Sequence, residues 1–149
     1  MAFLFLLIFG CYLVDCPDVR RDNWQFLEKD EEGIWLYYPE NVQPHWNDLI
    51  QVWTKKIYNQ KGVLDTVKKY GKDYLNLDYV ISVWEMDCLQ RKFKLISAHF
   101  YSKDNTIIYA YDNEKEGYFT PEDIPVDSHI ELLYNQVCGF NRPAPYSGR

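Results

Sequence analysis

The sequence contains few of the patterns that support catalysis. It has no C-x-x-C pair, no glycine-rich phosphate loop and no Gly-x-Ser-x-Gly elbow. These absences argue against a redox or zinc motif, a nucleotide-phosphate site and a serine hydrolase. The three histidines, His45, His99 and His129, do not pair with cysteines or carboxylates at the spacing of metal ligands. We interpret each as structural or solvated, and we expect no metal, no cofactor and no enzymatic activity.

Positive charge is also scarce. The chain has 16 Lys and Arg residues against 22 Asp and Glu residues, a net charge of -6 and a pI of about 5.0. Its basic residues are scattered rather than gathered into a stripe, which argues against a nucleic-acid partner. The acidic stretch that begins at Asp112 lacks the EF-hand pattern, so we interpret it as a solvated loop.

The amino terminus has no apolar run of about 20 residues, the length that a membrane-spanning helix needs. Residues 2–9 form a shorter unbroken run, which has the length of the hydrophobic region of a secretion signal. Gly10-Cys11 closes this run, and with Ile8 three positions before the cysteine it is similar to a bacterial lipobox. We therefore expect export to the outer membrane, periplasm or cell surface, with a lipid on Cys11 as the only membrane contact. The alternative is a buried amino-terminal strand in a cytosolic protein.

The rest of the chain divides into three parts. A polar segment at 12–23 is typical of a tether, and 24–140 has the length of a single domain. The last residues, 141–149, have the composition of a disordered tail. With the leader at 1–11, this gives four predicted segments.

Alternating apolar residues, rich in Tyr and Trp, predict a mostly β domain. The expected strands are 34–38, 49–58, 79–88, 92–102 and 106–111. Pro39 should end the first strand, with a loop at 40–48. The last three strands, joined by tight turns, predict an antiparallel meander. Both faces of the central strands are apolar, so we expect a helix, a partner subunit or a curled sheet to cover the second face.

Two segments change to helical spacing. Apolar residues at 62–75, including Tyr70 and Tyr74, recur every three or four positions and indicate a short amphipathic helix or a loop that crosses to the next strand. A clearer helix begins with Asp127 or Ser128 as its N-cap and ends at Gly139. The predicted fold class is therefore α+β: a single antiparallel β-sheet of about five or six strands, a C-terminal helix packed on it, and the short middle helix.

Of the four cysteines, two lie in the leader region before the domain and two lie in the domain. If the chain is exported, the two domain cysteines, Cys88 and Cys138, should form a disulfide in the oxidising compartment. Such a bond would join the end of a hairpin strand to the end of the last helix. The alternative is a pair of free thiols in a cytosolic protein.

Residues 24–138 resemble the surface-adhesin E family of small bacterial envelope lipoproteins. The resemblance depends on a set of short motifs: Trp24 before Tyr37-Tyr38, then Val52-Trp53, Met86-Asp87-Cys88, Arg91-Lys92-Phe93-Lys94, Pro125 with Ser128, and Asn135-Gln136-Val137-Cys138-Gly139. It implies an antiparallel sheet with a carboxy-terminal helix, a disulfide between the two matching cysteines, and no catalytic site. The typifying member of the family is an adhesin for host matrix proteins.

The resulting hypothesis is a non-enzymatic, envelope-anchored binding protein with a protein partner, either a host matrix protein or an envelope protein. The candidate binding surface consists of aromatic residues, at which a homodimer interface is one option, and core packing is the competing interpretation for each residue: Trp35, Tyr37, Trp53, Tyr109 and Tyr111. The alternatives are a periplasmic small-ligand binder and an accessory protein of envelope assembly or stress.

Overall fold

The computed structural model describes residues 23–45, 49–116 and 120–139. The predicted leader with Cys11, the tether apart from Asn23, and the predicted tail at 141–149 lie outside the described residues.

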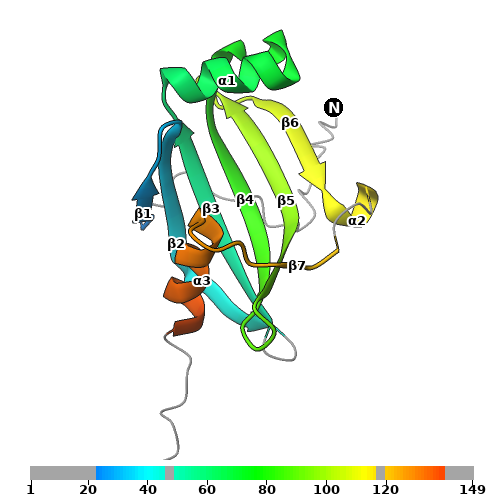
Figure 1. The fold of residues 1–149 in the computed structure, drawn as a ribbon. Coiled ribbons are helices and arrows are strands. Elements are labelled where there is room, and N and C mark those ends of the chain that lie inside the picture. The colour runs from blue at the N-terminus through cyan, green and yellow to red at the C-terminus, as the bar shows by residue number, and fades with distance from the viewer. Residues whose placement is uncertain (1–22, 46–48, 117–119, 140–149) are drawn as a thin grey trace, which may run out of the picture.

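One antiparallel sheet forms the centre of the molecule (Figure 1). Six strands follow one another in sequence order across it: β1 (Gln25–Lys29), β2 (Gly33–His45), β3 (Leu49–Tyr58), β4 (Leu77–Asp87), β5 (Lys92–Ser102) and β6 (Ile107–Asp112). A seventh, the short strand β7 (Glu122–Asp123), pairs with β5 beyond the reach of β6. Four further segments are helical: α1 (Gln60–Tyr70), the 3-10 helix η2 (Lys72–Asn76), α2 (Asn113–Glu116) and α3 (His129–Gly139). The predicted α+β class, the antiparallel sheet and the C-terminal helix are confirmed.

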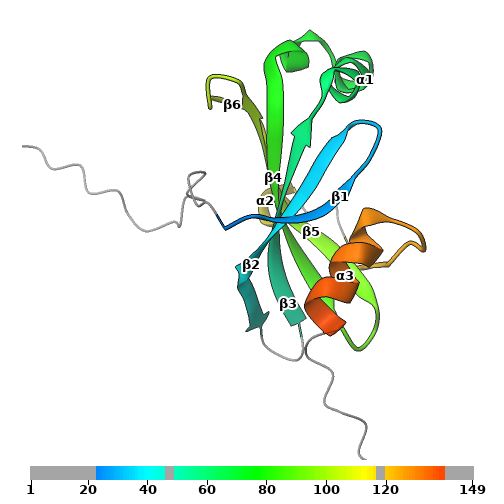
Figure 2. The ribbon, with the colours of Figure 1, turned by 90° about the vertical axis from the view of Figure 1, so that its left-hand side faces the viewer.

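The C-terminal helix α3 packs on one face of the sheet (Figure 2). Because side chains alternate along a strand, Ile50 and Val52 point to this face, as does Met86 of β4. They meet Leu133 and Val137 of α3 in the largest buried cluster. A second cluster, formed by Tyr79, Ile81 and Tyr101, lies on the opposite face, as the alternation along β4 requires. In the described residues no helix covers this opposite face (Figure 2).

The middle helix is present and lies across one end of the sheet (Figure 1). Asn59 caps α1, because its side chain accepts a hydrogen bond from the backbone N–H of Gly62 at 2.9 Å. Gly71 ends the helix with a φ of 110°, a backbone conformation that favours glycine. The chain then continues through η2 directly into β4, so the predicted segment 62–75 contains both a helix and a crossing.

The prediction that Pro39 ends its strand is wrong. β2 runs through Pro39 to His45, so residues 40–45 are strand rather than loop. The pairing of β2 with β3 shifts register between Tyr38 and Gln43, and such an irregularity accommodates a residue that lacks a backbone N–H. The sequence interpretation also missed β1, α2 and β7, which are the shortest elements apart from η2.

Candidate functional site

The five aromatic candidates are divided between core and surface. Trp35, Tyr37 and Tyr111 are buried, with 8%, 7% and 8% of their surface exposed. Trp53 is half-buried against the cluster on the face opposite α3. Tyr109 alone among the five is well exposed, at 43%. The five therefore do not form one surface.

Tyr109 belongs instead to a continuous series of rings, which we name the aromatic row: Tyr70, Tyr74, Phe100 and Tyr109. Successive ring centroids lie 5.9, 5.7 and 6.2 Å apart, and neighbouring rings are tilted or perpendicular rather than parallel. The row joins the end of α1 and η2 to β5 and β6. Tyr70 is 60% exposed, and Tyr74 and Phe100 are half-buried.

The fold leaves the aromatic row open. Between α1 and β7, no described element crosses β4 and β5 (Figure 1). In the part of the chain that the structure describes, the hydroxyl groups of Tyr74 and Tyr109 have no hydrogen-bond partner. Burial, together with the neighbouring Tyr109, Tyr70 and Asp73, raises the pKa of Tyr74, so its hydroxyl keeps its proton and remains a donor at neutral pH.

Sequence analysis singled out three of the four residues of this row but did not group them. The four-residue spacing of Tyr70 and Tyr74 indicated that both lie on one helix face, and Tyr109 was a candidate. Tyr74 reaches Phe100 because the chain returns to the sheet through η2. A hydrogen bond from the backbone N–H of Lys103 to the carbonyl of Asn76, at 3.0 Å, holds the end of η2 beside β5. No local pattern encodes such a contact.

The second notable region is the junction between α3 and the sheet. The disulfide joins Cys88 to Cys138 across 50 residues, with their Cα atoms 5.6 Å apart. Beside it, the hydroxyl of Tyr134 donates to the carbonyl of Cys88 at 2.9 Å, and Arg91 lies over the Tyr134 ring at 4.9 Å. These contacts hold the C-terminal half of α3 at the β4–β5 turn.

A buried lysine lies near the other end of α3. Lys56 is 5% exposed, and its ammonium group pairs with the carboxylates of Glu32 and, at 3.4 Å, Asp30. Burial alone would raise the pKa of Asp30, but hydrogen bonds from Trp35, Glu32 and Gly33 and the charge of Lys56 together lower it below its usual value. The ammonium group is thus neutralised within the protein, which indicates a structural role.

His129 begins α3 beside this cluster. Its ring stacks on Trp35 with centroids 4.0 Å apart. Burial, followed by repulsion from Lys56, lowers the pKa of His129, while Asp30 opposes the shift. The sequence interpretation of His129 as structural agrees with this environment.

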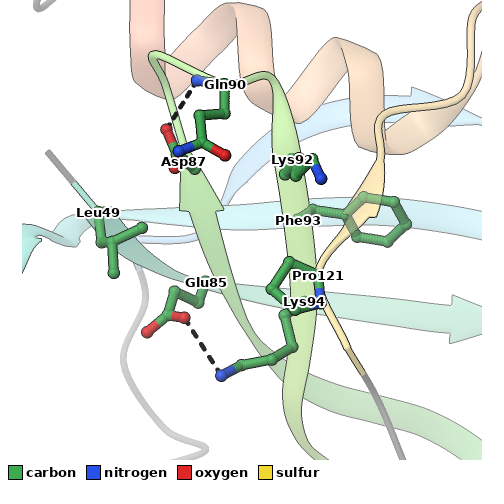
Figure 3. Close-up of a pocket in the computed structure, with 8 residues that line it drawn as sticks. All are labelled: Leu49, Glu85, Asp87, Gln90, Lys92, Phe93, Lys94 and Pro121. Carbon is green, nitrogen blue, oxygen red and sulfur yellow. Dashed lines mark hydrogen bonds and ion pairs between the residues drawn. The ribbon is translucent and has the colours of Figure 1, made fainter.

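A third region is a cavity of about 240 Å³ on the face opposite α3, which we name the charged pocket (Figure 3). Glu85 and Asp87 of β4 line one side of it, and Lys92 and Lys94 of β5 line the other. Glu85 and Lys94 form an ion pair at 3.3 Å, and both side chains are largely buried. Gln90, in the turn, closes one end.

Two classes of site are absent from the described part of the chain. Among residues 23–45, 49–116 and 120–139, no three His, Cys, Asp or Glu side chains come together as metal ligands. In the same residues, no helix has the length and apolar character needed to cross a membrane.

The fold and these sites define an α+β protein with a disulfide-tethered helix on one face of its sheet and an open aromatic row beside it. The family model of surface-adhesin protein E matches residues 24–139, and the chain belongs to this family. No curated protein and no solved structure matches the chain. Membership implies an exported protein of the cell surface that binds other proteins, and it confirms the resemblance found in the sequence.

Proposed function

We propose that this protein is a non-enzymatic adhesin-like binding protein, anchored to the cell envelope by a lipid on Cys11. Its membership of the surface-adhesin protein E family supports a binding role, and the lipobox-like segment that ends at Cys11 supports the anchor. Its partner is a protein, either of a host matrix or of the envelope. Intact-mass analysis of protein purified from envelopes should find acyl mass on Cys11, whereas an intact Met1 without acyl mass would contradict the anchor.

The aromatic row is the working surface in this proposal, and its exposure is the observation that carries it. Tyrosine offers a large, rigid apolar ring together with a hydroxyl group, which suits it to protein interfaces. Tyr70 and Tyr109 lie at the two ends of the row and are its most exposed members. A partner that contacts both ends would also cover Tyr74 and Phe100 between them.

The test is to replace Tyr70 and Tyr109 with serine in one variant. The Phe26→Ser variant is a matched control, because Phe26 is a 64% exposed aromatic residue of β1 that lies outside the row. Beads coated with each protein are measured for adhesion to immobilised matrix glycoproteins and to isolated envelopes. We expect the double variant to adhere about tenfold more weakly or worse, as loss of an aromatic anchor does at other interfaces.

Two readouts decide the outcome. Thermal unfolding checks that the double variant is folded. We expect it to fold, because both substituted side chains are exposed. Adhesion equal to that of the unaltered protein, or an equal loss in Phe26→Ser, would refute the aromatic row as the working surface.

A further inference from the structure

The charged pocket contains a pair of opposite charges that face each other across two strands without meeting. Asp87 and Lys92 are register partners in the antiparallel β4–β5 pair. No ion pair forms between them, although Glu85 and Lys94, two positions further along, do pair. In the part of the chain that the structure describes, the ammonium group of Lys92 has no partner at all.

The turn explains why the Asp87 carboxylate is held away from Lys92. One of its oxygens accepts hydrogen bonds from the backbone N–H groups of Leu89 and Gln90, at 3.0 and 2.8 Å. This fixes the orientation of the carboxylate, and no other residue that the structure describes donates a hydrogen bond to its second oxygen. Figure 3 shows Asp87 and Lys92 on opposite sides of the charged pocket. The protein therefore presents a carboxylate that the turn holds in place and, across the pocket from it, a cation that it does not touch.

Apart from Gln90, the remaining wall is apolar, and the space is small. Leu49 lines the cavity, together with Pro121 from the segment that leads into β7, whereas the ring of Phe93 packs beside Trp84 against the buried cluster on the α3 face. The volume of about 240 Å³ is below the usual range for drug-sized ligands, which begins at about 300 Å³. A suitable ligand therefore has few atoms, both charges and a short apolar group.

We propose that the charged pocket binds a small zwitterion, an apolar α-amino acid whose ammonium group meets Asp87 and whose carboxylate meets Lys92. Hydrogen bonds between charged groups are stronger than neutral ones, and the pocket offers one for each end of the ligand. The apolar side chain then lies against Leu49 and Pro121. This binding site is separate from the aromatic row and would serve a second, small-molecule function.

The test is a titration of the full chain with L-leucine, in which binding is measured by calorimetry and by changes in amide chemical shifts. Two half-ligands, 3-methylbutanoate and 3-methylbutylamine, each carry one charge and a similar apolar group. We expect each half-ligand to bind about tenfold more weakly or worse, because each leaves one charged group of the pocket without its partner.

Two variants locate the binding. Asp87→Asn keeps the oxygen that accepts from the turn but removes the charge, and Lys92→Gln removes the opposite charge. Each should lower the affinity for L-leucine about tenfold, while Lys68→Gln, on the exposed face of α1, should leave it unchanged. Failure of L-leucine to bind, equal binding of a half-ligand, or unchanged affinity in both pocket variants would each overturn the proposal.

Discussion

His129 occupies the first position of α3, with an aromatic ring on one side and an ammonium group nearby. Trp35 from β2 stacks on it, Lys56 from β3 repels its protonated form, and Asp30 from the β1–β2 turn attracts that form. The positive end of the helix dipole is a further reason for the ring to remain neutral. Burial and Lys56 outweigh Asp30, so the pKa of His129 in the folded protein lies below the ordinary value of 6.5.

This environment predicts a loss of stability in mild acid. As the pH falls through about 6.5, the unfolded chain binds a proton at His129 that the folded chain does not yet bind. The free energy of unfolding should therefore be lower at pH 5.5 than at pH 7.5, as measured by urea denaturation. His129→Gln should reduce this difference, although loss of the stacked ring also lowers stability at both pH values. An unchanged difference in the variant would show that His129 is not its source.

At the scale of the element, α1 depends on the backbone of two glycines. At Gly62 an added Cβ would collide with the carbonyl oxygen of Glu32, so the helix approaches the β1–β2 turn closely at this position. The side chain of Asn59 also stabilises the contact between α1 and the β1–β2 turn, since its amide donates to the carbonyl of Glu31 at 2.9 Å. Gly71 has open space around it, but its φ of 110° is one that other residues rarely adopt.

Gly71→Ala should therefore destabilise the protein without any steric clash. The expected cost is about 1 kcal/mol or more in the free energy of unfolding, from backbone strain alone. Gly139→Ala is the matched control, because Gly139 also has open space but has no positive φ. It should change stability little, and equal losses in the two variants in urea denaturation would argue against the strain.

Elements with a strong local pattern were predictable from the sequence, and those created by tertiary contact were not. β4 and β5 carry long alternating apolar runs, and α3 has its cap: Ser128 accepts from the N–H of Glu131 at 3.1 Å. Pro39 is a local signal against a strand. β2 nevertheless continues through it, because the irregular pairing of β2 with β3 accommodates a residue without a backbone N–H. β7 is only two residues long, and pairing with β5 alone makes it a strand.

The same distinction applies to the candidate sites of the whole molecule. The disulfide could be predicted by counting cysteines, because an exported domain with only two cysteines offers a single pairing. The aromatic row and the charged pocket required the topology, since each combines side chains from three or more elements. Composition gave the abundance of tyrosine but could not separate the exposed Tyr109 from the buried Tyr111, two positions away on the same strand.

The disulfide is also the feature that acts on the whole molecule, because it closes a loop that contains β5, β6, β7 and α3. In the chain-entropy model, a loop of 50 residues stabilises the folded state by about 4 kcal/mol, through its effect on the unfolded chain. The variant with Cys88→Ser and Cys138→Ser should lose stability up to that amount in urea denaturation. Reductant should lower the free energy of unfolding of the unaltered protein to that of the variant, and it should leave the free energy of unfolding of the variant unchanged. If titrated thiols prove that the bond is reduced and the unaltered protein remains as stable, α3 is held by its packing alone.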